Sequence, residues 1–469
     1  MMKLGTGTFV GHGMKFVRRM ILAKLLVPSE LGVMAIVFSV SIILEALTEV
    51  GVKQSVIQNK KGAEENYLNM AWWMQLVRGL CLYGIAFIAA PWISSYYGKP
   101  ELVVLLRVSF LAIVFRSLIS PRSYVLEKEY KFGRRVILIE GSTILGSIVT
   151  IILALLMRNV WALVFGFVSE AVVLFVFSFI LVPFIPKFSI DRSSLDALLK
   201  YARGIFGLPI LTAISFQAPI LILGKLINDY DLGIYNYAYL LAYFPVDLYM
   251  RIVSPILLPA FAEKQDQKDA LCRGIIEVNR WTSLTSLPLI AFMVCCACEL
   301  LYIAYKAEYA IMAMPFAVLC VQIIARNGAM ILAGVYLAIG KPHLHRYYTI
   351  LRALTVILIY PATIYGGVLG ASFAIIFGNF LVLFLQVMGC RKIIGLKFGD
   401  FIGSYKSGLL ASIPVIVAFD LLWYFKIDNL ILVLVIGACV FMVTFAVSAL
   451  IANRSKIMSL NKRKSTSQF

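Results

Sequence analysis

The stretch KLLVPSELGV, from Lys24 to Val33, returns later in the chain as KLINDYDLGI, from Lys225 to Ile234. The two copies align at a constant offset of 201 positions, with lysine, leucine, an acidic residue, leucine and glycine in register. A second pair, GKPEL at 98–102 and YKAEY at 305–309, follows in the same order at an offset of 207. All four stretches lie in short polar breaks between long apolar runs, so a duplicated helical bundle is the simplest cause.

The composition places the chain in a membrane. Hydrophobic residues make up 61% of the 469 residues and charged residues only 14%, whereas soluble domains are about half apolar and a quarter charged. Apolar runs of about 20 residues are typical of membrane-spanning helices. The runs do not alternate polar and apolar residues as the strands of a membrane barrel do, and lipid offers exposed backbone no hydrogen-bond partner. The sequence therefore predicts an all-α integral membrane protein.

The apolar runs predict about fourteen membrane-spanning helices. They are placed at 5–26, 31–57, 68–95, 101–120, 136–157, 160–185, 202–224, 232–261, 272–301, 309–340, 346–365, 367–390, 406–425 and 430–452. Six of them form each copy of the duplicated bundle, and the last two are an extra pair. Because six is even, the two copies share one orientation, and we expect a pseudo-twofold axis along the membrane normal.

Four segments follow from this arrangement. An N-terminal six-helix lobe covers 1–185, and a polar, amphipathic connector covers 186–201. A C-terminal six-helix lobe covers 202–392, and the extra helix pair with a basic tail covers 393–469. In the connector, Ser193 or Ser194 is expected to cap a short helix lying on the inner membrane surface.

The net charge of +19 is gathered on one side of the predicted membrane. With the N-terminus inside, 26 lysines and arginines fall in the inner loops and tail, and 5 fall in the outer loops. This bias follows the positive-inside rule and places both termini in the cytoplasm. The basic loops are expected to hold anionic lipid headgroups, and a nucleic-acid partner is not expected.

The sequence gives no sign of a metal or a nucleotide cofactor. The eight cysteines and three histidines do not occur at metal-ligand spacings. The phosphate-binding pattern GxxxxGK[ST] is absent from the chain, so direct use of ATP is not expected.

Several stretches carry a resemblance to a known family. They are LAKLLVPSELG at 22–32, GVKQSVIQNK at 51–60, APWISSYYGKPEL at 90–102, PKFSI at 186–190 and DLGIYNYAYLLAYFP at 231–245. In order and spacing the chain resembles the polysaccharide transporter family, in particular its colanic-acid-exporter-like branch. That branch lies within the multidrug/oligosaccharidyl-lipid/polysaccharide flippase superfamily. The chain departs from the family pattern at Lys24, where relatives carry arginine. It also has fewer residues before its first predicted span than relatives do, so we expect the start of the given sequence to be shortened.

The resemblance implies a flippase and not an enzyme. Its substrate would be an undecaprenyl-pyrophosphate-linked oligosaccharide, moved from the inner to the outer leaflet of the bacterial cytoplasmic membrane. The product would serve O-antigen (lipopolysaccharide), capsule or exopolysaccharide synthesis. The expected partners are the lipid bilayer and the glycosyltransferases and polymerase of the same pathway, and the expected state is a monomer.

Charged residues inside the predicted spans are the candidate site. Such charges are costly and therefore face the bundle interior or a water-filled cavity. Lys15, Arg18 and Arg19 fall within about 100° on one helix face, and arginine can bind a pyrophosphate bidentately. The residues predicted to bind substrate in one shared central cavity are Arg18, Arg19, Lys53, Arg251 and Arg352. The further cavity candidates are Lys15, Glu45, Glu49, Arg78, Asp247 and Arg326.

Other interpretations remain open. Glu49 and Lys53 are four residues apart, as are Asp247 and Arg251, and this spacing is typical of an ion pair within one helix. Arg116 is placed where a long side chain can reach the inner headgroups. A cation-coupled multidrug exporter of the same superfamily would use a lone buried carboxylate, such as Glu140 or Glu170. A membrane glycosyltransferase or polymerase would need a sizeable outer loop, and every predicted outer loop is short.

The charge bias generates a test of orientation. A cysteine at Ser194, in a variant without the eight native cysteines, should react with an impermeant thiol reagent only after the cells are opened. Labelling is read by mass shift on a gel, with a cysteine at Pro100 in the predicted outer loop between spans 68–95 and 101–120 as the accessible control. Reaction of the Ser194 position in intact cells would contradict cytoplasmic termini.

Overall fold

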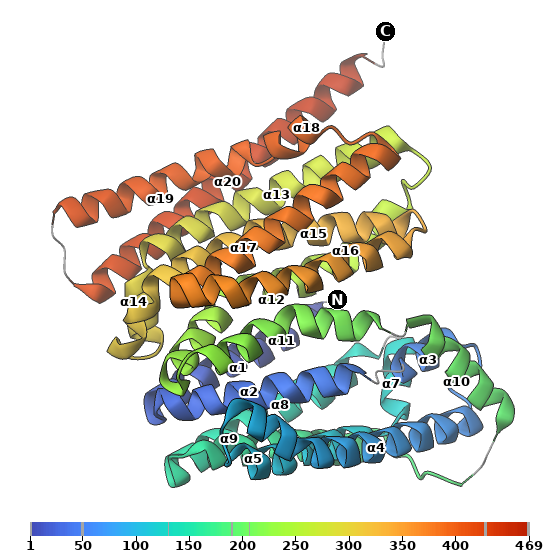
Figure 1. Ribbon diagram of the computed structural model, residues 1–469. Coiled ribbons are helices and arrows are strands. Elements are labelled where there is room, and N and C mark those ends of the chain that lie inside the picture. The colour runs from blue at the N-terminus through green and yellow to red at the C-terminus, as the bar shows by residue number, and fades with distance from the viewer. Residues whose placement is uncertain are drawn as a thin grey trace. The chain divides into compact units, whose positions relative to one another are not determined.

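The computed structural model describes residues 2–47, 51–129, 131–188, 191–205, 207–425 and 429–466. Within these ranges every regular element is a helix, as the all-α prediction requires (Figure 1). The chain forms two compact units, residues 1–237 and 238–469, which we call the first and the second unit. The division falls inside one long helix, so α11 and the start of α12 belong to the first unit.

The helices of the first unit overlap the predicted spans, but the predicted spans 31–57 and 101–120 are each divided into two helices. They are α1 (Met2–Leu25), α2 (Pro28–Leu47), α3 (Val52–Gln58), α4 (Glu65–Tyr97), α5 (Leu102–Ser109), α6 (Leu111–Ser117), α7 (Arg122–Lys128), α8 (Phe132–Met157), α9 (Val160–Leu181), α10 (Arg192–Ile205), α11 (Leu208–Leu226) and the start of α12 (Asp229–Ala262).

The second unit continues along α12. It then contains α13 (Lys268–Cys295), α14 (Ala297–Ala304), η1 (Ala307–Met312), α15 (Ala313–Ala338), α16 (Pro342–Thr355), η2 (Val356–Leu358), α17 (Ile359–Ile394), α18 (Phe398–Gly403), α19 (Lys406–Tyr424) and α20 (Leu430–Thr466).

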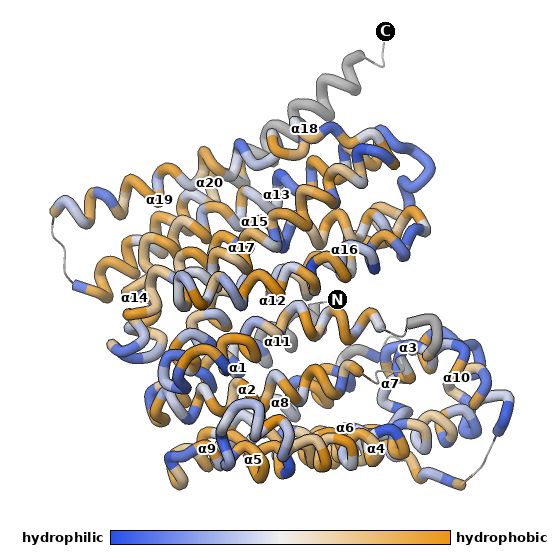
Figure 2. The backbone as a smooth tube through the Cα atoms, in the orientation of Figure 1, coloured by the Kyte–Doolittle hydropathy of each residue, from blue (hydrophilic) through white to orange (hydrophobic). Residues whose placement is uncertain are grey.

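The long helices are apolar along most of their length, with hydrophilic residues gathered near helix ends (Figure 2). In the part of the chain that the structure describes, nine helices are long and apolar enough to cross a membrane, or up to eleven with two bent pairs. Large apolar side chains such as Leu156 and Trp423 are exposed, 76% and 85% respectively, as expected of surfaces that contact lipid. The chain is therefore a multi-pass membrane protein, and the count of fourteen spans stays a prediction.

Two bends and one break in helical geometry interrupt the helices of the described residues. The helices on either side of Cys296, α13 and α14, are bent by 79°, and α7 is bent by 60° from the α5–α6 segment. Within α17 the backbone of Gly367 has φ 57° and ψ −147°, a conformation that only glycine adopts readily. The break at Gly367 separates the predicted spans 346–365 and 367–390. By contrast, the break at Cys296 interrupts a span predicted to be continuous.

The echoed stretches pack against each other within the first unit, at the starts of α2 and α12. A Cβ atom on Gly32 would lie 2.0 Å from the carbonyl oxygen of Asp229, and a Cβ on Gly233 would lie 1.9 Å from that of Pro28. Each glycine therefore touches the backbone of the other copy, as small residues allow in membrane helices. The reciprocal contact is what a duplicated, twofold-related motif predicts.

Polar contacts surround this glycine contact. Lys99 forms an ion pair with Asp229, and the Lys225 Nζ donates to the Tyr96 carbonyl oxygen at 2.5 Å. Deeper along the helices, the Ser39 Oγ donates to the Gln217 Oε1 at 3.1 Å. These contacts hold α11 and the start of α12 on the helices of the first copy.

The connector forms the expected amphipathic helix, but its cap differs from the prediction. The carboxylate of Asp191 accepts the backbone N–H groups of Ser193 and Ser194 at 3.1 and 3.2 Å, so Asp191 caps α10. Hydrogen bonds from the hydroxyls of Ser194 and then Ser193 hold the pKa of Asp191 below its usual range. The Ser194 side chain is buried, which makes the exposed Ser193 the better position for thiol labelling.

The glycine contact predicts that alanine destabilises the protein at Gly32 and Gly233 but not at a glycine with free space around it. Gly32→Ala and Gly233→Ala should each cost about 1–3 kcal/mol of stability, because the new methyl group meets backbone that cannot rotate away. Gly84→Ala, where a Cβ meets nothing within 4 Å, is the matched control and should be neutral or slightly stabilising. Melting temperatures of the purified proteins in one detergent measure the difference. Equal values for all three variants would refute the close approach.

Candidate functional site

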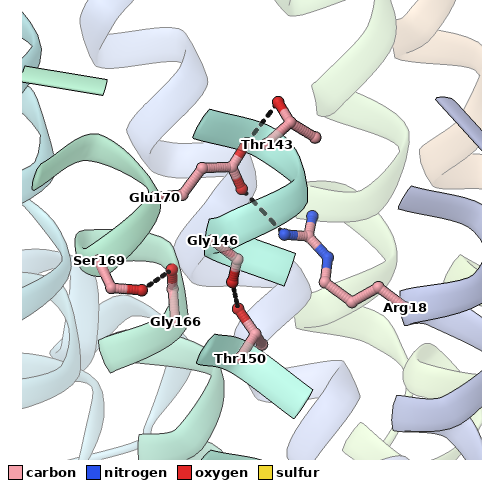
Figure 3. A network of polar contacts seen from close by, with 7 residues as sticks. All are labelled: Arg18, Thr143, Gly146, Thr150, Gly166, Ser169 and Glu170. Atoms are coloured by element: carbon pink, nitrogen blue, oxygen red, sulfur yellow. Dashed lines mark hydrogen bonds and ion pairs between the residues drawn. The ribbon is translucent and has the colours of Figure 1, made fainter. Parts of the chain in front are cut away.

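An ion pair links the first and ninth helices of the first unit. The Arg18 Nη1 on α1 lies 2.9 Å from the Glu170 Oε2 on α9, and each side chain is 19% exposed. The Thr143 Oγ1 on α8 donates to the other carboxylate oxygen at 3.4 Å. Figure 3 shows Arg18 and Thr143 approaching the same carboxylate from different helices. The three helices are therefore joined at one acidic group.

Two glycines let α8 and α9 come close enough for this contact. A Cβ on Gly146 would lie 2.7 Å from the Glu170 Cβ, and a Cβ on Gly166 would lie 2.4 Å from the Thr150 Oγ1. The Thr150 hydroxyl donates to the Gly146 carbonyl oxygen at 2.6 Å, and the Ser169 hydroxyl donates to that of Gly166 at 2.8 Å (Figure 3). Small residues thus set the helix spacing at which Glu170 reaches α1.

A second acidic residue of the first unit is held by arginines from two other helices. The Arg116 Nη1 on α6 lies 2.8 and 3.1 Å from the two carboxylate oxygens of Glu45 on α2. The Arg78 Nη2 on α4 donates to the Glu45 carbonyl oxygen at 2.8 Å. Arg116 also acts electrostatically on Glu170. The Arg116 guanidinium therefore pairs with Glu45, and its contact with the headgroups stays a prediction.

A small cavity lies beside this pair. Its volume is about 100 Å³, enough for several waters. The Gln75 Nε2 donates to the Tyr124 hydroxyl at 3.0 Å, and the buried Gln75 Oε1 has no hydrogen-bond partner among the described residues. The cavity is lined by Glu45, Gln75, Arg78, Gly79, Leu82, Ile113, Arg116, Ser117 and Tyr124.

Positive charge exceeds negative charge in this part of the first unit. Lys15 acts electrostatically on Glu170, Arg19 and Arg18 act on Tyr237, and Glu140 faces α1 at Gly11. The cations are Lys15, Arg18, Arg19, Arg78 and Arg116, and the acids are Glu45, Glu140 and Glu170. The surplus of two positive charges suits a doubly charged anion such as a pyrophosphate.

Lys53 lies in a different polar group. Its Nζ is 2.8 Å from the Glu127 Oε1 on α7, with the Lys53 side chain 38% exposed. The Arg135 Nε donates to the same oxygen at 2.5 Å. Lys53 thus ties α3 to α7, and its predicted contact with substrate stays a prediction.

The second unit brings together three of the other candidates. The Arg326 guanidinium carbon on α15 lies 5.9 Å from the centre of the Tyr243 ring on α12. Arg352 on α16 lies within electrostatic reach of Arg326 and Tyr243, and Asp247 within reach of Tyr243. Glu49 and the Arg251 side chain lie outside the described residues.

Sequence reasoning missed several partners. Arg18 and Glu170 are 152 positions apart, so no local spacing indicates that they meet. Tyr243 was also missed, although Tyr239, Tyr243 and Asp247 are spaced four apart on one helix face, which was the available signal. A shared central cavity for all five predicted residues stays a prediction, since Arg18 and Arg352 belong to different units.

The chain is similar to proteins of polysaccharide biosynthesis. A family model described as "Polysaccharide biosynthesis protein" matches residues 21–314. The succinoglycan biosynthesis transport protein ExoT of Rhizobium meliloti is 24% identical over 61% of this chain, and the match spans 57% of ExoT. A membrane protein in the cps region of Klebsiella pneumoniae is 23% identical over 92% of this chain and 91% of its own length.

Solved structures share the fold. The lipid II flippase MurJ, in an inward closed conformation, matches 97% of this chain and all of its own chain, with TM-score 0.77 and 14% identity. A multidrug transporter of the MATE family, inward-facing, matches 81% of this chain and 94% of its own, with TM-score 0.67 and 18% identity. At these identities the likeness shows the fold alone.

The Arg18–Glu170 pair predicts coupled effects on stability. Arg18→Met and Glu170→Gln should each destabilise the protein by about 1.5–3 kcal/mol, because each removes the charged hydrogen bond that joins α1 to α9. The double variant should lose less than the sum of the two single losses. Thermal unfolding in detergent measures the three values. Arg134→Met, which removes an exposed arginine of the same unit, is the control, and strictly additive losses would contradict the pairing.

Proposed function

The chain belongs to the polysaccharide biosynthesis protein family, and from that premise we propose that it is a lipid-linked oligosaccharide flippase. It moves an undecaprenyl-pyrophosphate-linked unit from the cytoplasmic to the outer leaflet by alternating access. The names of its relatives, one a succinoglycan transport protein, and the fold it shares with a lipid II flippase support this proposal.

The observation that carries the proposal is the surplus of positive charge inside the first unit. A cation at the bilayer centre costs at least about 2.5 kcal/mol unless it is compensated. The helices around the Arg18–Glu170 and Arg116–Glu45 pairs carry five cations and three acids, which is more positive charge than the two pairs need. A pyrophosphate supplies the missing negative charge, and guanidinium groups bind its oxygens bidentately.

The ion pairs suggest how the anion enters without leaving a bare carboxylate. Arg18 is held by Glu170 before substrate binds. When pyrophosphate takes the Arg18 guanidinium, Glu170 keeps the attraction of Lys15 and Arg116, which already act on it. Binding thus exchanges one anion for another on Arg18, and release to the outer leaflet restores the original pair.

The finer parts of the proposal rest on the family and on charge. Arg19, Lys53, Arg251 and Arg352 are proposed as further substrate contacts. The protein is proposed to lie in the bacterial cytoplasmic membrane with both termini in the cytoplasm. It would work beside the glycosyltransferases and polymerase of its pathway as a monomer, without catalysing a reaction itself.

A cation-coupled multidrug exporter is the second candidate, because a MATE transporter shares the fold. Such an exporter needs a carboxylate that gains and loses a cation during transport. Glu170 is held by Arg18 at 2.9 Å, so this carboxylate is already paired with a cation of the protein. The charge surplus also disfavours cationic drugs, so the flippase is the better supported function.

Loss of surface glycan tests the proposal in cells that lack the native protein. Arg18→Ala and Arg251→Ala should each abolish glycan display, measured per amount of protein present in the membrane. Arg18→Lys and Arg251→Lys should restore display only in part, because a lysine has no bidentate fork. Immunoblots of surface glycan and of the tagged protein measure both quantities, and Arg134→Ala is the control.

Two outcomes would overturn the proposal. One is normal glycan display with alanine at Arg18, Arg19, Lys53, Arg251 and Arg352 together. The other is normal display in a strain without the protein, combined with increased sensitivity to cationic drugs, which would favour the exporter.

A further inference from the structure

The chain leaves helix α9 through an irregular segment, 183–188, that exposes two large apolar side chains. Ile185 is 82% exposed and Phe188 is 77% exposed. Helix α9 ends at Leu181 and is apolar enough to cross a membrane. The segment therefore begins where hydrocarbon gives way to lipid headgroups, a level at which aromatic side chains are enriched in membrane proteins.

The start of α4 holds this segment in place. The Lys187 backbone N–H donates to the Asn69 Oδ1 at 3.0 Å, and the Trp73 ring N–H donates to the Lys187 carbonyl oxygen at 3.1 Å. The Trp73 and Phe188 rings meet edge to face, with centres 5.3 Å apart and planes 85° apart. The polar atom of Trp73 is thus satisfied by the protein, while the aromatic pair presents an apolar surface beside it.

Two cations, one on this segment and one on α7, share a single carboxylate of α4. The Arg122 Nη2 lies 3.6 Å from the Glu65 Oε1, and the Lys187 Nζ lies 3.7 Å from the Glu65 Oε2. Both distances exceed the usual range of an N–H···O hydrogen bond. The side chains of Arg122, Lys187 and Glu65 are 40%, 70% and 65% exposed, and exposed pairs of this kind are weak. The two cations are therefore available to a second anion.

The guanidinium of Arg122 is nevertheless fixed in direction. Its Nη1 donates to the Pro183 carbonyl oxygen at 3.2 Å, and its carbon atom lies 5.9 Å from the centre of the Phe184 ring. These contacts tie the start of α7 to the first residue of the segment. The guanidinium and the apolar residues Ile185 and Phe188 are thus parts of one local structure.

The chemistry of this surface matches an anionic phospholipid. A phosphodiester carries one negative charge, and Arg122, Lys187 and Glu65 together carry one net positive charge. An acyl chain has the apolar surface that Ile185 and Phe188 lack as a partner on their exposed sides. A protein partner would have to displace lipid from these residues, so their position at the end of a span favours a lipid. Basic groups at such a position attract anionic headgroups.

We propose that Arg122 and Lys187, with Trp73, Ile185 and Phe188, form a binding site for one anionic phospholipid of the adjoining leaflet. The lipid phosphate lies against the two cations, and the upper part of an acyl chain lies against the apolar residues. The site is on the membrane side that the charge bias assigns to the cytoplasm. It anchors the start of the connector, and it does not depend on which substrate the protein moves.

Native mass spectrometry of the full chain tests the site, with phosphatidylglycerol as the anionic probe and phosphatidylcholine as the zwitterionic one. The parent and one variant are measured together, so that a difference in bound lipid reports the substituted residue. Lys187→Gln should weaken phosphatidylglycerol binding about fivefold, as expected for one cation at an anionic surface. Arg134→Gln removes an exposed cation elsewhere in the first unit and should leave this affinity unchanged.

Glu65→Gln should have the opposite effect. It removes the carboxylate that competes with the lipid phosphate for Arg122 and Lys187, so phosphatidylglycerol should bind more tightly, by about fivefold. A merely structural role of the three side chains predicts no gain, because the exposed pairs would simply be lost. The gain is therefore specific to an anion at this place.

Phe188→Ser separates the apolar contact from the charge. Because the ring meets the acyl chain and not the headgroup, both lipids should bind more weakly and the preference for phosphatidylglycerol should stay. Lys187→Gln should instead reduce that preference. Inorganic phosphate in tenfold molar excess over lipid should not displace phosphatidylglycerol, since phosphate offers nothing to the apolar residues.

Three outcomes would overturn the lipid site. The first is equal phosphatidylglycerol binding by Lys187→Gln, Glu65→Gln and the parent. The second is a loss in Arg134→Gln as large as that in Lys187→Gln, which would show general attraction to a basic protein. The third is full displacement by inorganic phosphate, which would show a plain anion site. Lys187 and Glu65 are mostly exposed, so these variants fold even if a variant at Arg122 does not.

Discussion

A charge placed inside an apolar helix must find an opposite charge or a polar ligand, and the first unit is organised around this requirement. Arg18 on α1 is compensated by Glu170 on α9, and Arg116 on α6 by Glu45 on α2. Each pair joins helices that are distant in the sequence. The pairs thereby fix which helices adjoin.

Close packing and charge pairing depend on each other. The Glu170 carboxylate reaches Arg18 because Gly146 lets α8 approach the Glu170 stem, and the same principle operates where Gly32 and Gly233 meet. There the repeated motif packs against its own copy. Polar interactions surround these two glycines, such as the hydrogen bond from Lys225 to the Tyr96 carbonyl oxygen. A bundle of this kind is held by small residues at crossings and by few polar contacts, since lipid supplies no hydrophobic drive between helices.

The two units hold different sets of buried polar groups. The first combines lysine and arginine with carboxylates. The second places the Arg326 guanidinium beside the Tyr243 ring and buries the amide of Gln322, which has no hydrogen-bond partner among the described residues.

The sequence by itself determined that this protein is a helical membrane protein with a repeated motif, because apolar length and composition act locally along the chain. It also indicated Arg18, Arg326 and Arg352 as site candidates, since a charged residue within an apolar run can be recognised from the sequence alone. Only the tertiary structure decided that Arg18 pairs with Glu170, that Lys53 pairs with Glu127, and that Tyr243 adjoins Arg326. Pairing depends on distances of a few ångströms between helices that are far apart in the chain, and those distances are set by packing rather than by spacing in the sequence.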